Sequence, residues 1–215
     1  SFSQSAPPAP ALSFSPRWSL ELQDYQSLNR IVQGGGSYVA YSGWAMAGSM
    51  GKVNLGISQD GCAWANKELA GTSPGGPGGM GQYVVGYGGN DWLVALSSGS
   101  WAAGLRIFRS SDAGETWNEL IDVSFSDSFS GWPSEPLVYA QGSWFLSSGS
   151  WIYASSDRGS TWTRRPSFWS PSSPSITLIG QANDVLFARG NVGTLFYSTD
   201  GAFSWSQASM PRGIT

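Results

Sequence analysis

The chain has 215 residues, of which only 12% are charged, and it contains 29 glycines, 12 tryptophans and no histidine. Histidine is the commonest metal ligand and the commonest general base near neutral pH, so its absence excludes imidazole-based zinc sites, Ser/His/Asp triads and Cys/His dyads. The net charge of -3 without a basic run argues against nucleic-acid binding. No apolar stretch approaches the length of a membrane-spanning helix.

The composition indicates an all-β fold. Glycine, serine, tryptophan, tyrosine and valine favour turns and strands and are abundant, whereas Lys52 and Lys67 are the only lysines available for exposed helices. The single cysteine, Cys62, cannot form an internal disulfide bond. We expect no cofactor, because no pattern in the sequence predicts one.

Residues 1–16 are expected to form a Pro/Ser-rich arm or linker. The first 15 residues contain three prolines, no charge and no apolar stretch like that of a signal peptide. An extended arm can lie across a neighbouring protein, so we expect it to contribute to protein contacts in an assembly. Residues 17–215 are expected to form one folded domain, as the chain length allows.

In the rest of the chain, a unit of three short apolar strands occurs four times. The first strands are expected at residues 30–32, 83–85, 137–139 and 176–179. The second strands are expected at residues 38–41, 92–96, 144–146 and 185–188, and the third at residues 53–57, 105–108, 151–154 and 195–197. Tight turns between the first and second strands are expected at residues 35–37, 89–91, 141–143 and 182–184.

Each third strand is followed by a short phrase that ends in tryptophan. The phrases at 110–117 and 155–162 agree at six of eight positions, and looser copies occupy residues 198–205 and 58–64. Their aspartates, at positions 60, 112, 157 and 200, are 52, 45 and 43 residues apart. A period of this length is typical of a four-stranded β-propeller blade, in which the residues after each phrase supply the fourth strand.

The residue types in these phrases predict a structural role. An aspartate carboxylate can accept hydrogen bonds from backbone N–H groups one or two residues further on and so stabilise a tight turn. Glycine permits a positive φ, and burial of the tryptophan ring contributes on the order of 3 kcal/mol. We therefore expect structural rather than catalytic positions at Asp60, Trp64, Asp112, Gly114, Trp117, Asp157, Gly159, Trp162, Asp200 and Trp205.

The phrases resemble the Asp-box, or BNR repeat, whose pattern is Ser-x-Asp-x-Gly-x-x-Trp. Two copies match it in full, whereas the glycine after Asp200 comes one position early and Asp60 is one residue nearer to its tryptophan. In sialidases, sortilin-like receptors, a photosystem II assembly factor and many phage and bacterial surface proteins, this repeat lies between the third and fourth strands of β-propeller blades. The resemblance implies an all-β propeller of four-stranded antiparallel blades. Its four repeats would form either a four-bladed ring, closed by a strand at residues 18–22, or part of a larger ring.

The resemblance does not extend to catalysis. Sialidases of the family need an arginine triad introduced by a phrase such as Arg-Ile-Pro, which the chain lacks. A generic glycosidase needs two carboxylates on opposite sides of the scissile bond, but Asp91 and Asp184 fall at tight turns and are interpreted as solvated turn residues. The Asp-x-Asp-x-Asp spacing of calcium loops is absent, so no metal site is expected. The remaining acids are interpreted in the same way as Asp91: Glu115, Glu119, Asp122 and Asp127.

Aromatic residues in two loops are the remaining candidates for function. Trp132, Phe168 and Trp169 lie in Ser/Pro/Gly-rich segments at 126–136 and 166–174. There an aromatic ring can stack on a sugar, contact a partner protein or pack against its own blade.

These observations predict a non-catalytic structural or adhesion subunit of an extracellular assembly, such as a tail, fibre or decoration protein of a phage virion. The prediction rests on the frequent use of Asp-box propellers in such assemblies, which is an argument from analogy. The alternative is a carbohydrate-binding, lectin-like propeller that recognises surface glycans. A third alternative is an assembly factor like the photosystem one. It is weaker, because the propeller of that family is longer and rich in arginine.

Overall fold

The computed structural model describes residues 28, 30–45, 53–69, 81–97, 105–120, 124–125, 133–148, 151–166, 177–190 and 194–209. Regular structure in these ranges consists of β-strands, which confirms the all-β prediction. In the same ranges, no helix has the length and apolar character needed to cross a membrane.

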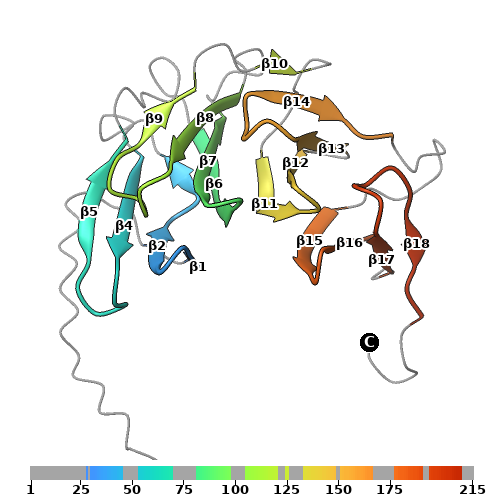
Figure 1. The fold of residues 1–215 in the computed structure, drawn as a ribbon, viewed down its shortest axis with the longest axis horizontal. Coiled ribbons are helices and arrows are strands. Elements are labelled where there is room, and N and C mark those ends of the chain that lie inside the picture. The colour runs from blue at the N-terminus through green and yellow to red at the C-terminus, as the bar shows by residue number, and fades with distance from the viewer. Residues whose placement is uncertain are drawn as a thin grey trace, which may run out of the picture.

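The strands form four sheets that follow one another along the chain (Figure 1). The first sheet contains β1 (Arg30–Gly34), β2 (Ser37–Tyr41), β4 (Asn54–Ser58) and β5 (Ala65–Glu68). The second contains β6 (Gly81–Gly88), β7 (Asp91–Ser97), β8 (Leu105–Ser110) and β9 (Asn118–Glu119), with the short β3 (Trp44–Ala45) beside β6. The third contains β11 (Pro133–Ala140), β12 (Ser143–Ser148), β13 (Trp151–Ser155) and β14 (Thr161–Arg164), with β10 (Ser124–Phe125) parallel to β14. The fourth contains β15 (Thr177–Ala182), β16 (Val185–Arg189), β17 (Leu195–Ser198) and β18 (Ser206–Gln207).

In each sheet the four principal strands are antiparallel and lie in chain order. Every predicted first, second and third strand corresponds to an observed strand, and the residues at the end of each phrase supply the fourth. The predicted class of four-stranded antiparallel sheets is therefore confirmed. The ring-closing strand expected at residues 18–22 lies outside the described residues, and the division into residues 1–16 and 17–215 stays a prediction.

Two-residue turns join the first and second strands of every sheet. Positive φ at both central positions is the type I′ geometry, whose twist matches that of the flanking strands. Glycine and asparagine adopt these angles at low cost, which explains their frequency here. The turn pairs are Gly35–Gly36, Gly89–Asn90, Gln141–Gly142 and Asn183–Asp184, with φ between 49° and 77°.

Neighbouring sheets pack face to face through three apolar clusters. Side chains on a strand alternate between its two faces, so Trp92 packs against the first sheet whereas Leu93 packs against the third. The same alternation directs Trp144 toward the second sheet and Phe145 toward the fourth. The strand β7 is consequently buried along its whole length.

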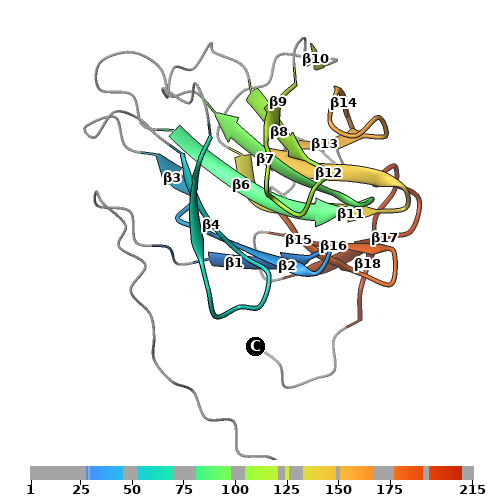
Figure 2. The ribbon, with the colours of Figure 1, turned by 60° about the vertical axis from the view of Figure 1, so that its left-hand side comes forward.

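The four sheets stand in an arch, with β1, β6, β11 and β15 toward its centre and β5, β9, β14 and β18 toward its outer side (Figure 1). Figure 2 shows β6, β7 and β8 side by side in the second sheet. Near the centre, Tyr87 covers Gly34 and Tyr139 covers Gly88, where an added Cβ atom would lie 2.1 and 2.0 Å from the respective tyrosine. The close approach of the inner strands therefore requires glycine at these two positions.

Candidate functional site

Each third strand ends in a turn built around an aspartate, and we call the segments 58–64, 110–117, 155–162 and 198–205 the four aspartate turns. In the second turn, Asp112 Oδ1 accepts hydrogen bonds from the Ser110 hydroxyl (2.8 Å) and the Thr116 N–H (2.9 Å). The Thr116 hydroxyl donates to Oδ2 at 2.5 Å. Both carboxylate oxygens are therefore engaged within the turn.

The third and fourth turns repeat this arrangement in full, and the first turn repeats the bonds to Oδ1. The serine hydroxyl donates to Oδ1 at 2.8–3.1 Å in the pairs Ser58–Asp60, Ser155–Asp157 and Ser198–Asp200. Oδ1 also accepts bonds of 2.8–2.9 Å from the backbone N–H groups of Ala63, Thr161 and Ser204. We expected these donors one or two residues after the aspartate, whereas they lie two to four residues after it. The chain passes through positive-φ residues before its N–H groups point back to the carboxylate.

These bonds favour the ionised form of the turn aspartates. The hydroxyl and N–H groups of Thr116 lower the pKa of Asp112 from 3.8 to about 2. The equivalent groups of Ser204 lower the pKa of Asp200 to about 2. Backbone N–H groups of the first turn likewise lower the pKa of Asp60. A carboxylate that is ionised at neutral pH and bonded in this way is poorly suited to act as a general acid.

The positive-φ residues of the turns lie against the preceding sheet. Gly114 has a φ of 90°, and a Cβ atom added there would lie 3.2 Å from Ile57 of the first sheet. Gly159 has a φ of 93°, and its Cβ would lie 3.2 Å from Leu93 of the second sheet. In the fourth turn Ala202 takes this position, with a φ of 64° and its methyl group buried between the third and fourth sheets. The turns therefore form part of the contact between neighbouring sheets.

The four turn tryptophans differ in burial. Nε1 of Trp117 and of Trp162 donates a 2.9 Å hydrogen bond to the carbonyl of the glycine in the same turn. Nε1 of Trp64 makes the corresponding bond at 3.2 Å. Trp162 and Trp205 are buried, whereas Trp64 and Trp117 are half-buried.

Asp91 forms a link between sheets that sequence reasoning missed. Its carboxylate is buried and accepts two hydrogen bonds from the Arg158 guanidinium, at 2.6 and 2.7 Å. The interpretation of Asp91 as a solvated turn residue is wrong, because Asp91 begins β7 and bonds to the third aspartate turn. Asp184 does lie in a turn, where its carboxylate accepts a 3.2 Å bond from the Gln141 N–H. The sequence held one signal for this ion pair: the third turn has the charged Arg158 at the position where the second turn has Ala113.

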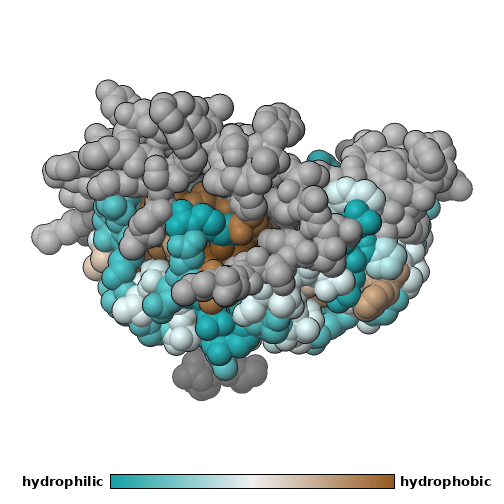
Figure 3. All heavy atoms as spheres, turned by 90° about the horizontal axis from the view of Figure 1, so that it is seen from above, coloured by the Kyte–Doolittle hydropathy of each residue, from teal (hydrophilic) through white to brown (hydrophobic). Residues whose placement is uncertain are grey.

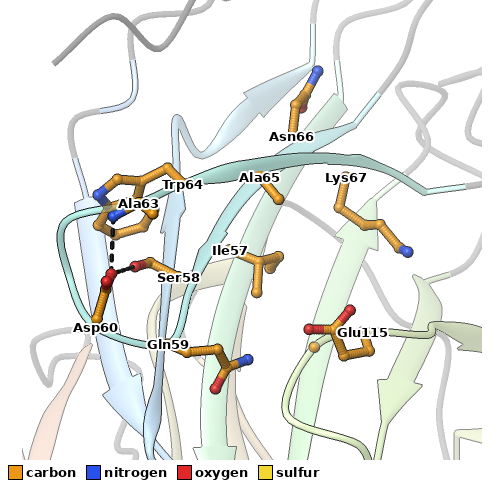
Figure 4. A pocket seen from close by; sticks show the side chains of 11 residues that line it. Ile57, Ser58, Gln59, Asp60, Ala63, Trp64, Ala65, Asn66, Lys67 and Glu115 are labelled. Carbon is orange, nitrogen blue, oxygen red and sulfur yellow. Dashed lines mark hydrogen bonds between the residues drawn. The ribbon is translucent and has the colours of Figure 1, made fainter. Parts of the chain in front are cut away.

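A cavity of about 420 Å³ lies beside the first aspartate turn, between the first and second sheets (Figure 4). Ile57 and Ala65 line its apolar part, and Lys67 and Glu115 point toward one another across it (Figure 4). Lys67 belongs to β5 and Glu115 to the second turn, so only the packing of the two sheets brings them together. Other lining residues are Gln59, Asp60, Trp64 and Asn66.

A second cavity, of about 330 Å³, lies along the innermost strands. All four sheets contribute to it, and its wall is rich in tyrosine and aliphatic side chains. Lining residues include Val32, Tyr41, Val85, Tyr87, Tyr139 and Gln181.

Among the described residues, no group of three or more His, Cys, Asp or Glu residues is placed to hold a metal ion. The predicted contact residues Trp132, Phe168 and Trp169 lie outside the described residues and stay predictions. Seen from above, the described surface is mainly teal and pale, with brown apolar side chains visible near its middle (Figure 3).

No protein-family model matches the chain, and the comparison with curated proteins finds no match. Solved structures do match. YCF48 from Cyanidioschyzon merolae is 14% identical with a TM-score of 0.54, over 83% of this chain and 54% of that one. A protein of unknown function from Dyadobacter fermentans is 14% identical with a TM-score of 0.55, over 82% and 66%. Hadza microbial sialidase Hz136 is 15% identical with a TM-score of 0.52, over 85% and 46%.

The fold is a β-propeller. YCF48 and the sialidases are propellers, and the four antiparallel sheets repeat the blade of that fold. At 14–15% identity the likeness shows the fold alone. The chain spans about half the length of the YCF48 and sialidase chains that it matches.

Proposed function

We propose that this propeller is a non-catalytic structural or adhesion subunit of an extracellular assembly, such as a tail, fibre or decoration component of a phage virion. The observation that carries the proposal is the engagement of the turn carboxylates in holding their own turns. In this proposal the four aspartate turns are Asp-box repeats, supported by the recurring Ser-to-Asp bonds and by their place between the third and fourth strands of each sheet.

The other carboxylates with known partners also favour a structural role. Asp91 is paired with Arg158, and Glu119 accepts two 2.6 Å bonds from the Arg106 guanidinium, which lower the pKa of Glu119. A glycosidase needs one protonated and one ionised carboxyl group on opposite sides of a bond. Glu119 and the turn aspartates Asp112 and Asp200, whose pKa values are lowered, are poor candidates for the protonated partner.

Two measurements test this proposal. Hydrolysis of fluorogenic sialosides and aryl glycosides by the full chain should stay at the buffer rate, and turnover that scales with protein concentration would overturn the non-catalytic assignment. Electron microscopy with gold-labelled antibodies, on particles from a culture that carries the gene, should place the chain at a regular position on the particle. Labelling confined to the interior of cells would overturn the extracellular role. A chain lacking residues 1–16 should show weaker incorporation if the arm contacts a neighbour.

A carbohydrate-binding function is the second candidate, and the cavity beside the first turn favours it. That cavity combines the half-buried Trp64 with amide and charged side chains, a set that can contact the apolar face and the hydroxyl groups of a sugar. A glycan array should then give binding that is lost in Lys67→Ala, with Arg189→Ala, at an exposed position of the fourth sheet, as the control. Loss of glycan binding in Trp132→Ala and Trp169→Ala would instead place the glycan at the predicted loops. An array on which no glycan binds the chain would rule out the carbohydrate-binding function.

A further inference from the structure

The two ends of the arch expose positions that are buried in the other sheets. Ile31 of β1 pairs with Ala40 of β2, as Val85 pairs with Val94 in the second sheet, and both occupy the same place in the repeat. Val85 is 2% exposed because the first sheet covers it, whereas Ile31 is 62% exposed. Among the described strands, none forms a sheet that precedes the first sheet and covers this face.

Likewise, none of the described strands forms a sheet that follows the fourth sheet. Tyr197 of β17 pairs with Phe187 of β16, as Ala154 pairs with Phe145 in the third sheet. Phe145 and Ala154 are buried under the fourth sheet, whereas Phe187 is only half-buried and Tyr197 is 38% exposed. The two ends of the arch therefore do not cover one another.

These uncovered faces continue the three interfaces already present. In each interface, one sheet packs on the next sheet along the chain through the face that corresponds to Phe187 and Tyr197 in the fourth sheet. The face that it contacts on the next sheet corresponds to Ile31 in the first sheet. The last sheet presents the aromatic rings of Phe187 and Tyr197, and the first presents Ile31, whereas Ala40 and Gly56 on the same face are buried. Leu28 lies next to Gly56 and leaves Ile31 uncovered.

We propose that the uncovered face of the fourth sheet packs on the uncovered first sheet of a second copy, and that the second copy returns the same contact. A head-to-tail contact of this kind closes when the rotation between copies completes a circle, which here gives a two-fold ring of eight sheets. Eight blades lie within the usual range for propellers. Since the chain covers 54% and 46% of two solved propeller chains, two copies supply a comparable length of chain.

The inference deepens the proposed structural role, on which it rests, by naming a copy of this chain as one partner. The first experiment is the mass of the full chain by sedimentation or light scattering at tens of micromolar. The expected mass is twice 22.8 kDa. Ile31→Asp and Tyr197→Asp should each return the mass to 22.8 kDa with an unchanged circular-dichroism spectrum, because both side chains are exposed in the single chain.

Phe203→Asp is the matched control. Phe203 is also exposed, but its ring stacks with the Arg165 guanidinium, 4.1 Å from the ring centre, on the side of the third sheet. The Phe203→Asp chain should keep the double mass. A wild-type chain that stays at 22.8 kDa overturns the proposal, as does a dimer that survives both Ile31→Asp and Tyr197→Asp.

Cross-linking tests the geometry of the contact. Two differently tagged chains, both with Cys62→Ser, carry Ile31→Cys and Tyr197→Cys respectively. The mixture is treated with a long-armed bis-maleimide cross-linker, because Ile31 lies on a first strand and Tyr197 on a third strand. The proposal expects cross-links between the two tags, whereas links only between identical chains would overturn it. One chain with both cysteines that links within itself as a monomer would instead show a self-closed ring. A monomer that still labels particles would leave the proposed function standing, and a dimer found only inside cells would overturn that function alone.

Discussion

Arg158 of the third aspartate turn donates two hydrogen bonds, of 2.6 and 2.7 Å, to the Asp91 carboxylate of the second sheet. Asp91 is 1% exposed, whereas the Arg158 side chain remains 57% exposed. The hydrogen bonds to Asp91 raise the pKa of Arg158. The geometry is bidentate, which is the strong form of an arginine–carboxylate contact. This pair therefore anchors the third turn to the preceding sheet.

Removal of the arginine should destabilise the protein. Arg158→Met leaves the buried carboxylate of Asp91 without its partner, and an unsatisfied buried acceptor costs about 1–3 kcal/mol, with more for a charged group. The double variant Asp91→Ser/Arg158→Ala copies Ser37 and Ala113, the residues at these positions in the first sheet and the second turn. Its free energy of unfolding, measured in urea, should recover toward that of the wild type. An Arg158→Met chain as stable as the wild type would contradict this role.

The turn aspartates should make stability depend on pH at acidic values. The pKa of Asp112 in the folded chain is about 2, below its ordinary value of 3.8. A lowered pKa contributes stability that is present above the ordinary pKa and is lost as the pH falls through the folded pKa. The melting temperature of the wild type should therefore fall between about pH 4 and pH 2.

The variant Asp112→Asn isolates this contribution. It should melt lower than the wild type at pH 7, and the gap should narrow toward pH 2. The same result is expected for Asp200→Asn, since the pKa of Asp200 is also about 2. Glu115→Gln, in the same turn as Asp112, is the control. Its melting temperature should change with pH in parallel with that of the wild type. If the melting temperature of Asp112→Asn changed with pH in parallel with that of the wild type, the prediction would be contradicted.

Replacement by alanine of the glycine at the fifth position of the second or third turn should destabilise the protein more than replacement of the glycine in the fourth turn. Gly159→Ala forces an L-residue to a φ of 93° and brings its Cβ to 3.2 Å from Leu93. The φ penalty alone is roughly 1–2 kcal/mol. Gly201→Ala has a φ of 73° but its closest contact is 3.8 Å away, at Gln141. Thermal melts should rank Gly159→Ala below Gly201→Ala, and the reverse order would refute the role of close packing.

The buried turn tryptophan should matter more than a half-buried one. Trp162→Ala removes a ring from the apolar cluster between the second and third sheets, at a cost of about 3–5 kcal/mol. Trp117 is half-buried, so Trp117→Ala should cost less. Urea unfolding of the two variants compares them directly, and equal losses would show that burial does not set the difference.

The strands and turns could be predicted from the sequence because they depend on neighbours along the chain. The repeated phrases place each aspartate beside its serine and hydroxyl donors, within four residues. The contact of Asp91 with Arg158 could not be predicted, because the two residues are 67 positions apart and belong to different sheets. The same holds for the approach of Lys67 to Glu115.

By itself, the sequence determined the repeat, the order of the strands and the chemistry of each aspartate turn, since short-range hydrogen bonds and side-chain alternation decide them. Only the tertiary structure decided which faces are covered. Trp162 is buried and Trp117 half-buried within similar phrases, and Ile31 is exposed where Val85 is not. These differences arise because burial depends on whether a neighbouring sheet lies against that face, which no local pattern records.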